Sequence, residues 1–191
     1  MHSATYTIPG KEKFTSFRTL SPQGKIQPLK DRFFDNMTKR YKGHNPPAEI
    51  FTTFKTYLNF LPRLPYSHSE GYFWTDGSPV AGDTFIVVFD VPQFIDRVII
   101  DSGSESHPSD ILENARLKAS LTVIKTPARM ECTNDIDLGT FKDGRIEVKD
   151  ISSMVKFKIV CLQIQVLKEQ TAWVIIREIA VFVSNEWRPE K

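Results

Sequence analysis

Residues 85–101 read FIVVFDVPQFIDRVIID, two short apolar runs on either side of Pro92. The first run, 85–89, is continuously apolar and is bounded by Asp83 and Asp90, a pattern that favours a strand in the buried centre of a β-sandwich. The second run, 94–101, predicts a strand that follows directly. The centre of the chain is therefore predicted to be β-structure.

Further strands follow toward the C-terminus. Residues 116–124 and 172–183 predict strands, and 139–148 predicts a hairpin region because Asp143-Gly144 is a strong two-residue turn signal. Between residues 155 and 166 the apolar positions change from odd to even. A one-residue change of phase reverses the two faces of a strand, so we expect a bulge or a crossing between sheets there. With no long helical period, the chain is predicted to be an all-β sandwich.

Length and charge indicate one compact domain preceded by a tail. At 191 residues the chain is long enough to bury a core, and its net charge of +2 gives no general case for a nucleic-acid partner. Residues 1–43 hold nine Lys/Arg against three Asp/Glu. We therefore expect 1–43 to be a basic linker and 44–191 to be the domain. The lysines of the tail are scattered, which does not favour a nucleic-acid arm.

Membrane, metal and cofactor signals are weak in this sequence. No stretch approaches the ~20 apolar residues of a membrane span, and the N-terminus lacks the apolar core of a signal peptide. No metal-ligand cluster or glycine-rich phosphate loop is present, so we expect no metal and no cofactor. Cys132 and Cys161 are too few for a disulfide scaffold, and we expect two buried thiols. The alternative is that the two cysteines form a disulfide in an oxidising compartment.

One group of aromatic and acidic residues, all expected on loops, indicates sugar binding. The group comprises Tyr72, Trp74, Asp83, His107 and Asp110. An aromatic ring packs on the C–H face of a sugar, and a carboxylate accepts charge-assisted hydrogen bonds from its hydroxyls. The alternative is that Trp74 is a core residue and that the two aspartates form turns or caps. Trp173 lies among Val174, Ile175 and Ile176, so we expect it in the core.

Catalytic interpretations have less support. Asp135-Ile136-Asp137 matches the acid-x-acid motif with which many glycosyltransferases hold a metal and a nucleotide sugar. That chemistry also needs an α/β nucleotide-binding domain, and the chain shows no βαβ alternation. We therefore interpret the motif as a solvated strand edge. Hydrolysis by Asp83 and Asp110 as a carboxylate pair remains an alternative, because the two could approach in space.

An ordered set of motifs resembles a known family. The motifs are NPPAE at 45–49, YFW at 72–74, AGD at 81–83, SG at 102–103 and HPSD at 107–110, followed by Trp173. Together they resemble the C-terminal lectin-like domain of the N-acetylglucosaminyltransferase IV enzymes, which add a β1,4-linked branch to the α1,3-mannose arm of N-glycans. The resemblance runs from about residue 24 to about residue 183. Gly71 and a longer loop from Trp74 to Pro79 depart from the family pattern.

The resemblance implies a jelly-roll sandwich of the galactose-binding-like, carbohydrate-binding-module type. It implies that Asp83, Trp74, His107, Asp110 and Tyr72 bind an N-glycan with terminal N-acetylglucosamine, in the Golgi lumen. The chain itself is then a non-catalytic module without direct membrane insertion. A second interpretation is a truncated relative that binds and modulates another glycosyltransferase. Asn36, in the only glycosylation sequon, is a candidate for glycosylation.

Overall fold

The computed structural model describes the backbone of four short strands at 3–7, 15–19, 33–35 and 40–42, and all of residues 45–67 and 71–184. The strands are β1 Ser3–Thr7, β2 Thr15–Thr19, β3 Phe33–Asp35, β4 Arg40–Lys42, β5 Ala48–Thr52, β6 Phe73–Trp74, β7 Thr84–Gln93, β8 Ile95–Ser102, β9 Ala115–Thr126, β10 Arg129–Thr140, β11 Arg145–Val148, β12 Ile159–Val166 and β13 Ile175–Val183. One short helix, α1 Ile151–Met154, precedes β12. The all-β prediction is confirmed.

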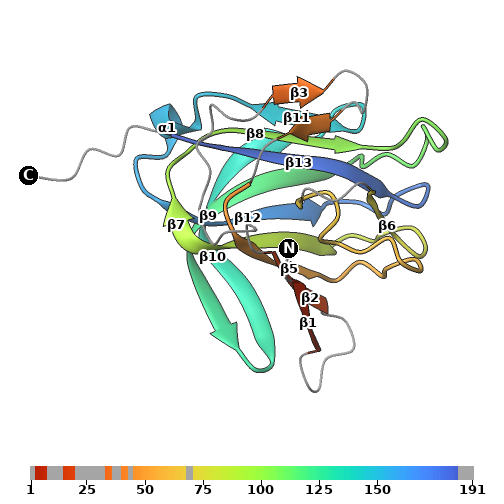
Figure 1. Ribbon diagram of the computed structural model, residues 1–191, viewed down its shortest axis with the longest axis horizontal. Helices are drawn as coiled ribbons and strands as arrows, with labels where there is room; N and C mark the ends of the chain where they lie inside the picture. The colour runs from red at the N-terminus through yellow and green to blue at the C-terminus, as the bar shows by residue number, and fades with distance from the viewer. Residues whose placement is uncertain are drawn as a thin grey trace, which may run out of the picture.

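The strands form two antiparallel sheets that face each other (Figure 1). The larger sheet has the order β1-β2-β5-β7-β12-β9-β10, and the smaller sheet has the order β11-β8-β13-β6. A separate two-stranded sheet pairs β3 with β4. Because β2 pairs with β5, strands from residues 1–43 extend the larger sheet. The domain boundary expected at residue 44 stays a prediction.

The apolar run of β7 is buried on both of its faces. Phe85, Val87 and Phe89 point between the two sheets into the main core, where they are 1–4% exposed. Ile86, on the opposite face, is also buried and belongs to a second apolar cluster with Phe51. A strand with one solvated face would alternate apolar and polar residues, so the continuous run reflects a cover on the outer face of the sheet.

The cover of the outer face is the β9–β10 hairpin. At the end of β9, the Lys125 ammonium lies 2.8 Å from a Glu49 carboxylate oxygen and 5.6 Å from the centre of the Phe51 ring. Both partners lie on β5, and strands β7 and β12 separate β5 from β9 in the sheet. The hairpin therefore bends out of the sheet and folds over its outer face.

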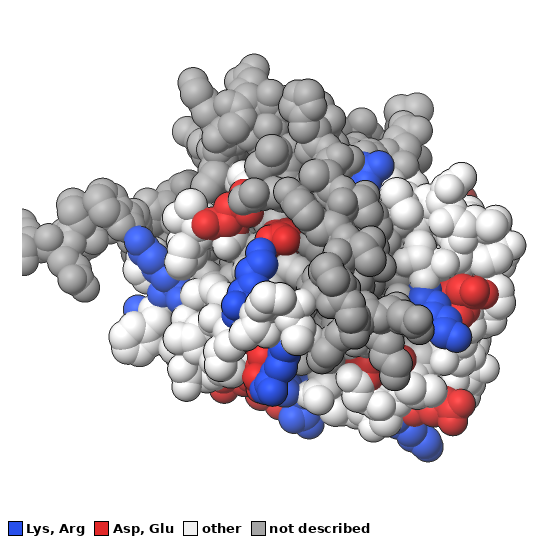
Figure 2. Space-filling model, turned by 90° about the horizontal axis from the view of Figure 1, so that it is seen from below, with Lys and Arg blue, Asp and Glu red and all other residues white. Residues whose placement is uncertain are grey.

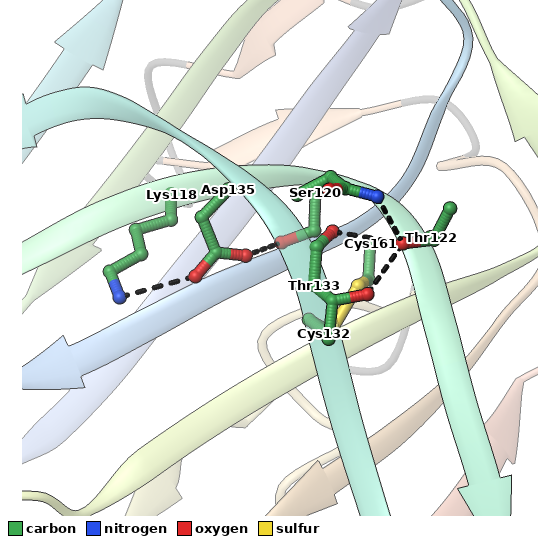
Figure 3. Close-up of a disulfide and its surroundings, with 8 residues drawn as sticks. Lys118, Ser120, Thr122, Cys132, Thr133, Asp135 and Cys161 are labelled. Carbon is green, nitrogen blue, oxygen red and sulfur yellow. Dashed lines mark hydrogen bonds and ion pairs between the residues drawn. A yellow bond between two sulfur atoms is a disulfide. The ribbon is translucent and has the colours of Figure 1, made fainter.

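A disulfide holds this hairpin in place. Cys132 of β10 is bonded to Cys161 of β12, with the Cα atoms 6.5 Å apart (Figure 3). The expectation of two buried thiols was therefore wrong. β9 lies between these strands in the sheet, and only the bending of the hairpin brings β10 close to β12. Beside the disulfide, the Ser120 hydroxyl donates to Asp135 at 2.5 Å, as Figure 3 shows.

The two-residue turn and the change of phase predicted from the sequence are confirmed, but the hairpin expected at 139–148 was wrong. Asp143 and Gly144 both have positive φ, 50° and 76°, and the flanking residues exchange both backbone hydrogen bonds, as the two-residue turn requires. The turn leads from the larger sheet to the smaller one, so β10 and β11 do not continue as a hairpin. The change of phase before residue 166 corresponds to a register shift between Ile159 and Cys161. Phe157 lies outside the strand and is 68% exposed.

The acid-x-acid motif lies on the edge strand β10, as interpreted from the sequence. Asp135 pairs with Lys118 at 3.3 Å, and Asp137 with Arg116 at 3.4 Å. Both partners lie on the neighbouring strand β9, so the two carboxylates serve cross-strand pairs. Within the described ranges, no group of three or more His, Cys, Asp or Glu side chains is placed to hold a metal ion, and no helix could span a membrane.

Glu147 of β11 is the centre of an ion-pair network on the smaller sheet. Burial by itself would raise the pKa of Glu147, but hydrogen bonds from Arg97 and Arg145 outweigh it and bring the pKa below its ordinary value of 4.5. Arg145 also donates to both oxygens of Asp101, at 2.6 and 2.7 Å. Because the pKa of Glu147 is lower in the folded state, its ionised form stabilises the fold at neutral pH. That contribution is lost as the pH falls through the lowered pKa.

We expect Glu147→Gln to lower the free energy of unfolding at pH 7 by about 0.5–1 kcal/mol. The difference from wild type should shrink as the pH falls below 4.5, where the wild-type carboxylate also becomes protonated. Urea unfolding at several pH values measures this. Glu131→Gln, in the exposed pair with Arg129, is the control and should change little. A difference that stays constant down to pH 3 would contradict the prediction.

Candidate functional site

Four loops meet at one end of the sandwich, on the right in Figure 1 and opposite α1. They comprise residues 53–60, 71–83, 103–114 and 167–174. Loops at one end of a rigid sandwich are where binding residues are usually found. Every sequence-predicted sugar-binding residue lies in these loops or at their junctions with strands.

Trp74 is presented to this end by the short strand β6. β6 pairs with β13, with Trp74 opposite Ile175 and Phe73 opposite Ile176. Since side chains alternate along a strand, Phe73 enters the core with no exposed surface and Trp74 points away from it, half-buried. The alternative that Trp74 is a core residue is therefore not what the structure shows.

Around Trp74 lies a half-buried group of six rings, the aromatic platform. Its members are Tyr57, Phe60, Tyr72, Trp74, His107 and Trp173. Trp74 contacts each of the others, with ring centroids 4.5 Å away for His107 and 5.2–6.2 Å away for the rest. Most pairs are edge-to-face, an arrangement favoured by the ring quadrupoles. The platform is a rigid aromatic surface at the end of the sandwich.

The loop 103–114 fixes His107 and Asp110 beside Trp74. The His107 amide donates to the Ser104 hydroxyl at 3.1 Å, and the Asp110 amide donates to the His107 carbonyl at 3.3 Å. Gly103 has φ 78°, and a Cβ there would lie 2.8 Å from Ile111, so only glycine fits where the loop begins. The side chain of His107 contacts the Ser106 hydroxyl through Nδ1 at 3.0 Å.

Asp110 is tied directly to Trp74. The indole Nε1–H donates to Asp110 Oδ2 at 3.0 Å, and the Asp110 carbonyl accepts from the Ile175 amide at 2.8 Å. In the described part of the chain, Oδ1 of Asp110 has no hydrogen-bond partner. A half-buried carboxylate beside an aromatic surface, with one oxygen available, can accept from a ligand hydroxyl.

Asp83 lies elsewhere on the same end. Its Oδ1 accepts from the Thr53 hydroxyl and its Oδ2 from the Val80 amide, both at 2.9 Å. These bonds tie the 80–83 loop to the residues that follow β5. Asp83 lines a cleft of about 740 Å³ together with residues 53–56 and 75–80. Trp74, His107 and Asp110 are not among the residues that line this cleft.

The structure thus brings together four of the five predicted residues, Tyr72, Trp74, His107 and Asp110. Asp83 lines the neighbouring cleft instead. The core assignment of Trp173 was wrong, because its ring is half-buried in the platform, 5.1 Å from that of Tyr57. Tyr57 and Phe60 were not predicted from the sequence. The signal that could have found them is the pair of aromatic residues in the short stretch TYLNF at 56–60. Asn36 lies outside the described residues.

Asp83 can be tested for its structural role directly. We expect Asp83→Ala to lower the free energy of unfolding by about 1 kcal/mol, because the Val80 amide and the Thr53 hydroxyl lose their acceptor. Asp83→Asn keeps one acceptor and should cost less. Denaturant unfolding of both variants measures the effect. If Asp83→Ala unfolds at the wild-type midpoint, the carboxylate does not hold the loop.

Comparisons with known proteins agree with this architecture. The family model described as the MGAT4 C-terminal domain matches residues 48–178. The chain is 32% identical to the alpha-1,3-mannosyl-glycoprotein 4-beta-N-acetylglucosaminyltransferase C of Sus scrofa, covering 89% of this chain and 40% of the pig protein. It is 30% identical to the alpha-1,6-mannosyl-glycoprotein 4-beta-N-acetylglucosaminyltransferase of Gallus gallus, covering 74% of this chain. The chain thus spans less than half the length of these relatives.

A solved structure shows the same fold. The CBM32-1 and CBM32-2 domains of Clostridium perfringens ZmpB, in complex with GalNAc, align with a TM-score of 0.52 and 11% identity, over 96% of this chain and 41% of that one. At this identity the likeness concerns the fold, a galactose-binding-like β-sandwich, and confirms the predicted fold class. The family match and the identity to the pig enzyme together cover most of the chain. The chain belongs to the MGAT4 C-terminal domain family.

Proposed function

We propose that this lectin-like domain binds the terminal N-acetylglucosamine of an N-glycan on the aromatic platform. The observation that carries the proposal is the joint placement of Trp74, His107 and Asp110. An indole held by a carboxylate at 3.0 Å, with an imidazole 4.5 Å from its ring, offers a flat apolar surface and polar groups side by side. A pyranose ring needs both, because it has an apolar face and an equatorial rim of hydroxyls.

Each member of the platform has a role in this proposal. The sugar packs against the Trp74 ring, and a hydroxyl donates to Asp110 Oδ1. His107 and Tyr72 contribute polar contacts at the edges. Asp83 acts as a positioning residue that holds the 80–83 loop. On the face seen from below in Figure 2, the described residues carry charges of both signs, interspersed with uncharged residues.

The ligand class comes from the family. The relatives are named as enzymes that attach N-acetylglucosamine to mannosyl glycoproteins. We propose that the domain, in the Golgi lumen, keeps such a glycan near a transferase and performs no transfer itself. In the described residues the sandwich carries no βαβ nucleotide-binding unit. We expect an affinity in the millimolar range, which corresponds to a binding free energy of about 4 kcal/mol.

A glycan array with the purified chain tests the proposal, followed by titration of N-acetylglucosamine against wild type. The expected result is selective retention of glycans that end in N-acetylglucosamine, without turnover of a UDP-N-acetylglucosamine donor. Retention of no glycan, combined with stable co-purification of a glycosyltransferase, would instead support a modulator of another enzyme. Measurable transfer by the isolated chain would overturn the non-catalytic role.

A further inference from the structure

The cleft beside the platform has the features of a second binding position. Its walls include Phe54 and Pro79, and its polar groups come from Lys55, Asp76 and Asp83, with several hydroxyl side chains. At about 740 Å³ it falls within the range of about 300–1,000 Å³ that is usual for small-molecule sites. The proposed function above leaves it without a role.

Backbone pairing links this cleft to the platform. Thr56 and Thr75 form an isolated antiparallel bridge. The Tyr57 amide donates to the Trp74 carbonyl, and the Asp76 amide donates to the Lys55 carbonyl, both at 2.9 Å. Lys55 is therefore opposite Asp76, just as Tyr57 is opposite Trp74. Since side chains two residues apart share a face, Lys55 and Asp76 stand on the same face as Trp74, one pair further along.

The polar groups of the cleft divide into two kinds. Thr75 and Asp83 make internal hydrogen bonds. The Thr75 hydroxyl donates to the Gly77 carbonyl at 2.7 Å, and the Asp83 carboxylate accepts from the Thr53 hydroxyl at 2.9 Å. These bonds hold the residues that line the cleft in place. In contrast, within the described ranges neither the Lys55 ammonium nor the Asp76 carboxylate has a partner, and the two do not form an ion pair with each other. Among the described residues, the cleft thus offers a ligand two charged groups without an internal partner, the Lys55 ammonium and the Asp76 carboxylate.

We propose that the cleft is a second sugar subsite, which takes the residue linked to the terminal N-acetylglucosamine. The inference rests on the proposed function and deepens it, because the ligand becomes a disaccharide end. Neighbouring sugar hydroxyls both donate and accept, so one of them donates to Asp76 while another accepts from Lys55. Both contacts are charge-assisted, which makes them stronger than contacts between neutral groups. Val80, an exposed apolar residue of the cleft lining, supplies apolar contact for the ring.

The test compares one sugar with two. N-acetylglucosamine and the disaccharide N-acetylglucosamine-β1,4-mannose are titrated calorimetrically against wild type, Asp76→Asn and Lys55→Met. Wild type should bind the disaccharide about tenfold more tightly than the monosaccharide, since the charge-assisted contacts add more than about 1.4 kcal/mol. Both variants should lose this gain and keep monosaccharide affinity within about twofold of wild type. Unchanged monosaccharide binding also shows that they are folded.

Lys142→Met, an exposed lysine of the turn before β11, is the matched control and should keep the full disaccharide preference. If wild type binds both sugars equally, or if Asp76→Asn and Lys55→Met keep the preference, the subsite is overturned while the function stands. If wild type binds neither sugar, the subsite and the proposed function both fail.

Discussion

Replacing both Cys132 and Cys161 by alanine is expected to lower the free energy of unfolding by about 3–4 kcal/mol. The disulfide joins residues separated by 29 positions, and closing a loop of that length in the unfolded chain gives a stabilisation of this size in the chain-entropy model. The hairpin over the outer face should loosen as well, exposing Phe51 and Ile86. Denaturant unfolding and binding of a hydrophobic dye measure the two effects.

Controls separate the covalent link from the packing of the two side chains. Wild type treated with a reductant loses only the link, whereas the alanine variant also loses two buried sulfur atoms. The reduced wild type should therefore be slightly more stable than the alanine variant, and the difference measures the packing of the two side chains. The serine variant should be less stable than the alanine variant, since both positions are buried and the hydroxyls would lack partners. Alkylation of the native chain in denaturant without reductant should label neither cysteine. Labelling of both would show free thiols and contradict the disulfide.

Trp74→Ala is expected to abolish measurable glycan binding, a loss of more than about tenfold in affinity for a ligand bound by only about 4 kcal/mol. The substitution removes the surface on which the sugar packs and leaves Asp110 without its indole donor. It also takes away ring contacts with Tyr57 and Phe60, so the unfolding midpoint should fall too. Titration of the array ligand and a denaturant melt are therefore run on the same sample.

Two milder variants show whether the loss of binding comes from the aromatic surface or from the Asp110 carboxylate. Trp74→Phe keeps an aromatic ring but loses the Nε1–H donor to Asp110 and part of the ring surface, so it should retain part of the affinity. Asp110→Asn keeps an acceptor but loses the charge, and should weaken binding without removing the aromatic surface. Because Trp173 belongs to the same platform, a bound sugar should also change the intrinsic tryptophan fluorescence. Wild-type affinity in a folded Trp74→Ala variant would move the site away from the platform.

Local chemistry in the sequence determined the strands and their turns. The apolar run at 85–89, the turn signal at Asp143-Gly144 and the change of phase before residue 166 each correspond to a feature of the structure. These signals depend on side-chain alternation and on the backbone conformations that Gly and Asp tolerate. Such properties act over a few residues, which is why one sequence is enough to read them.

Only the tertiary structure decided which distant residues meet. The Cys132–Cys161 bond depends on the bending of the β9–β10 hairpin, which no local pattern reports. Trp173 looked like a core residue from its apolar neighbours, yet it lies in the platform because it stands in the loop before β13 begins at Ile175. Asp83 and Asp110 were both expected on loops, but their partners differ. Asp83 accepts from the Val80 amide of its own loop, and Asp110 accepts from the indole of Trp74. The physical reason is that a loop's position is set by the strands that carry it, and strand order depends on pairing across the whole chain.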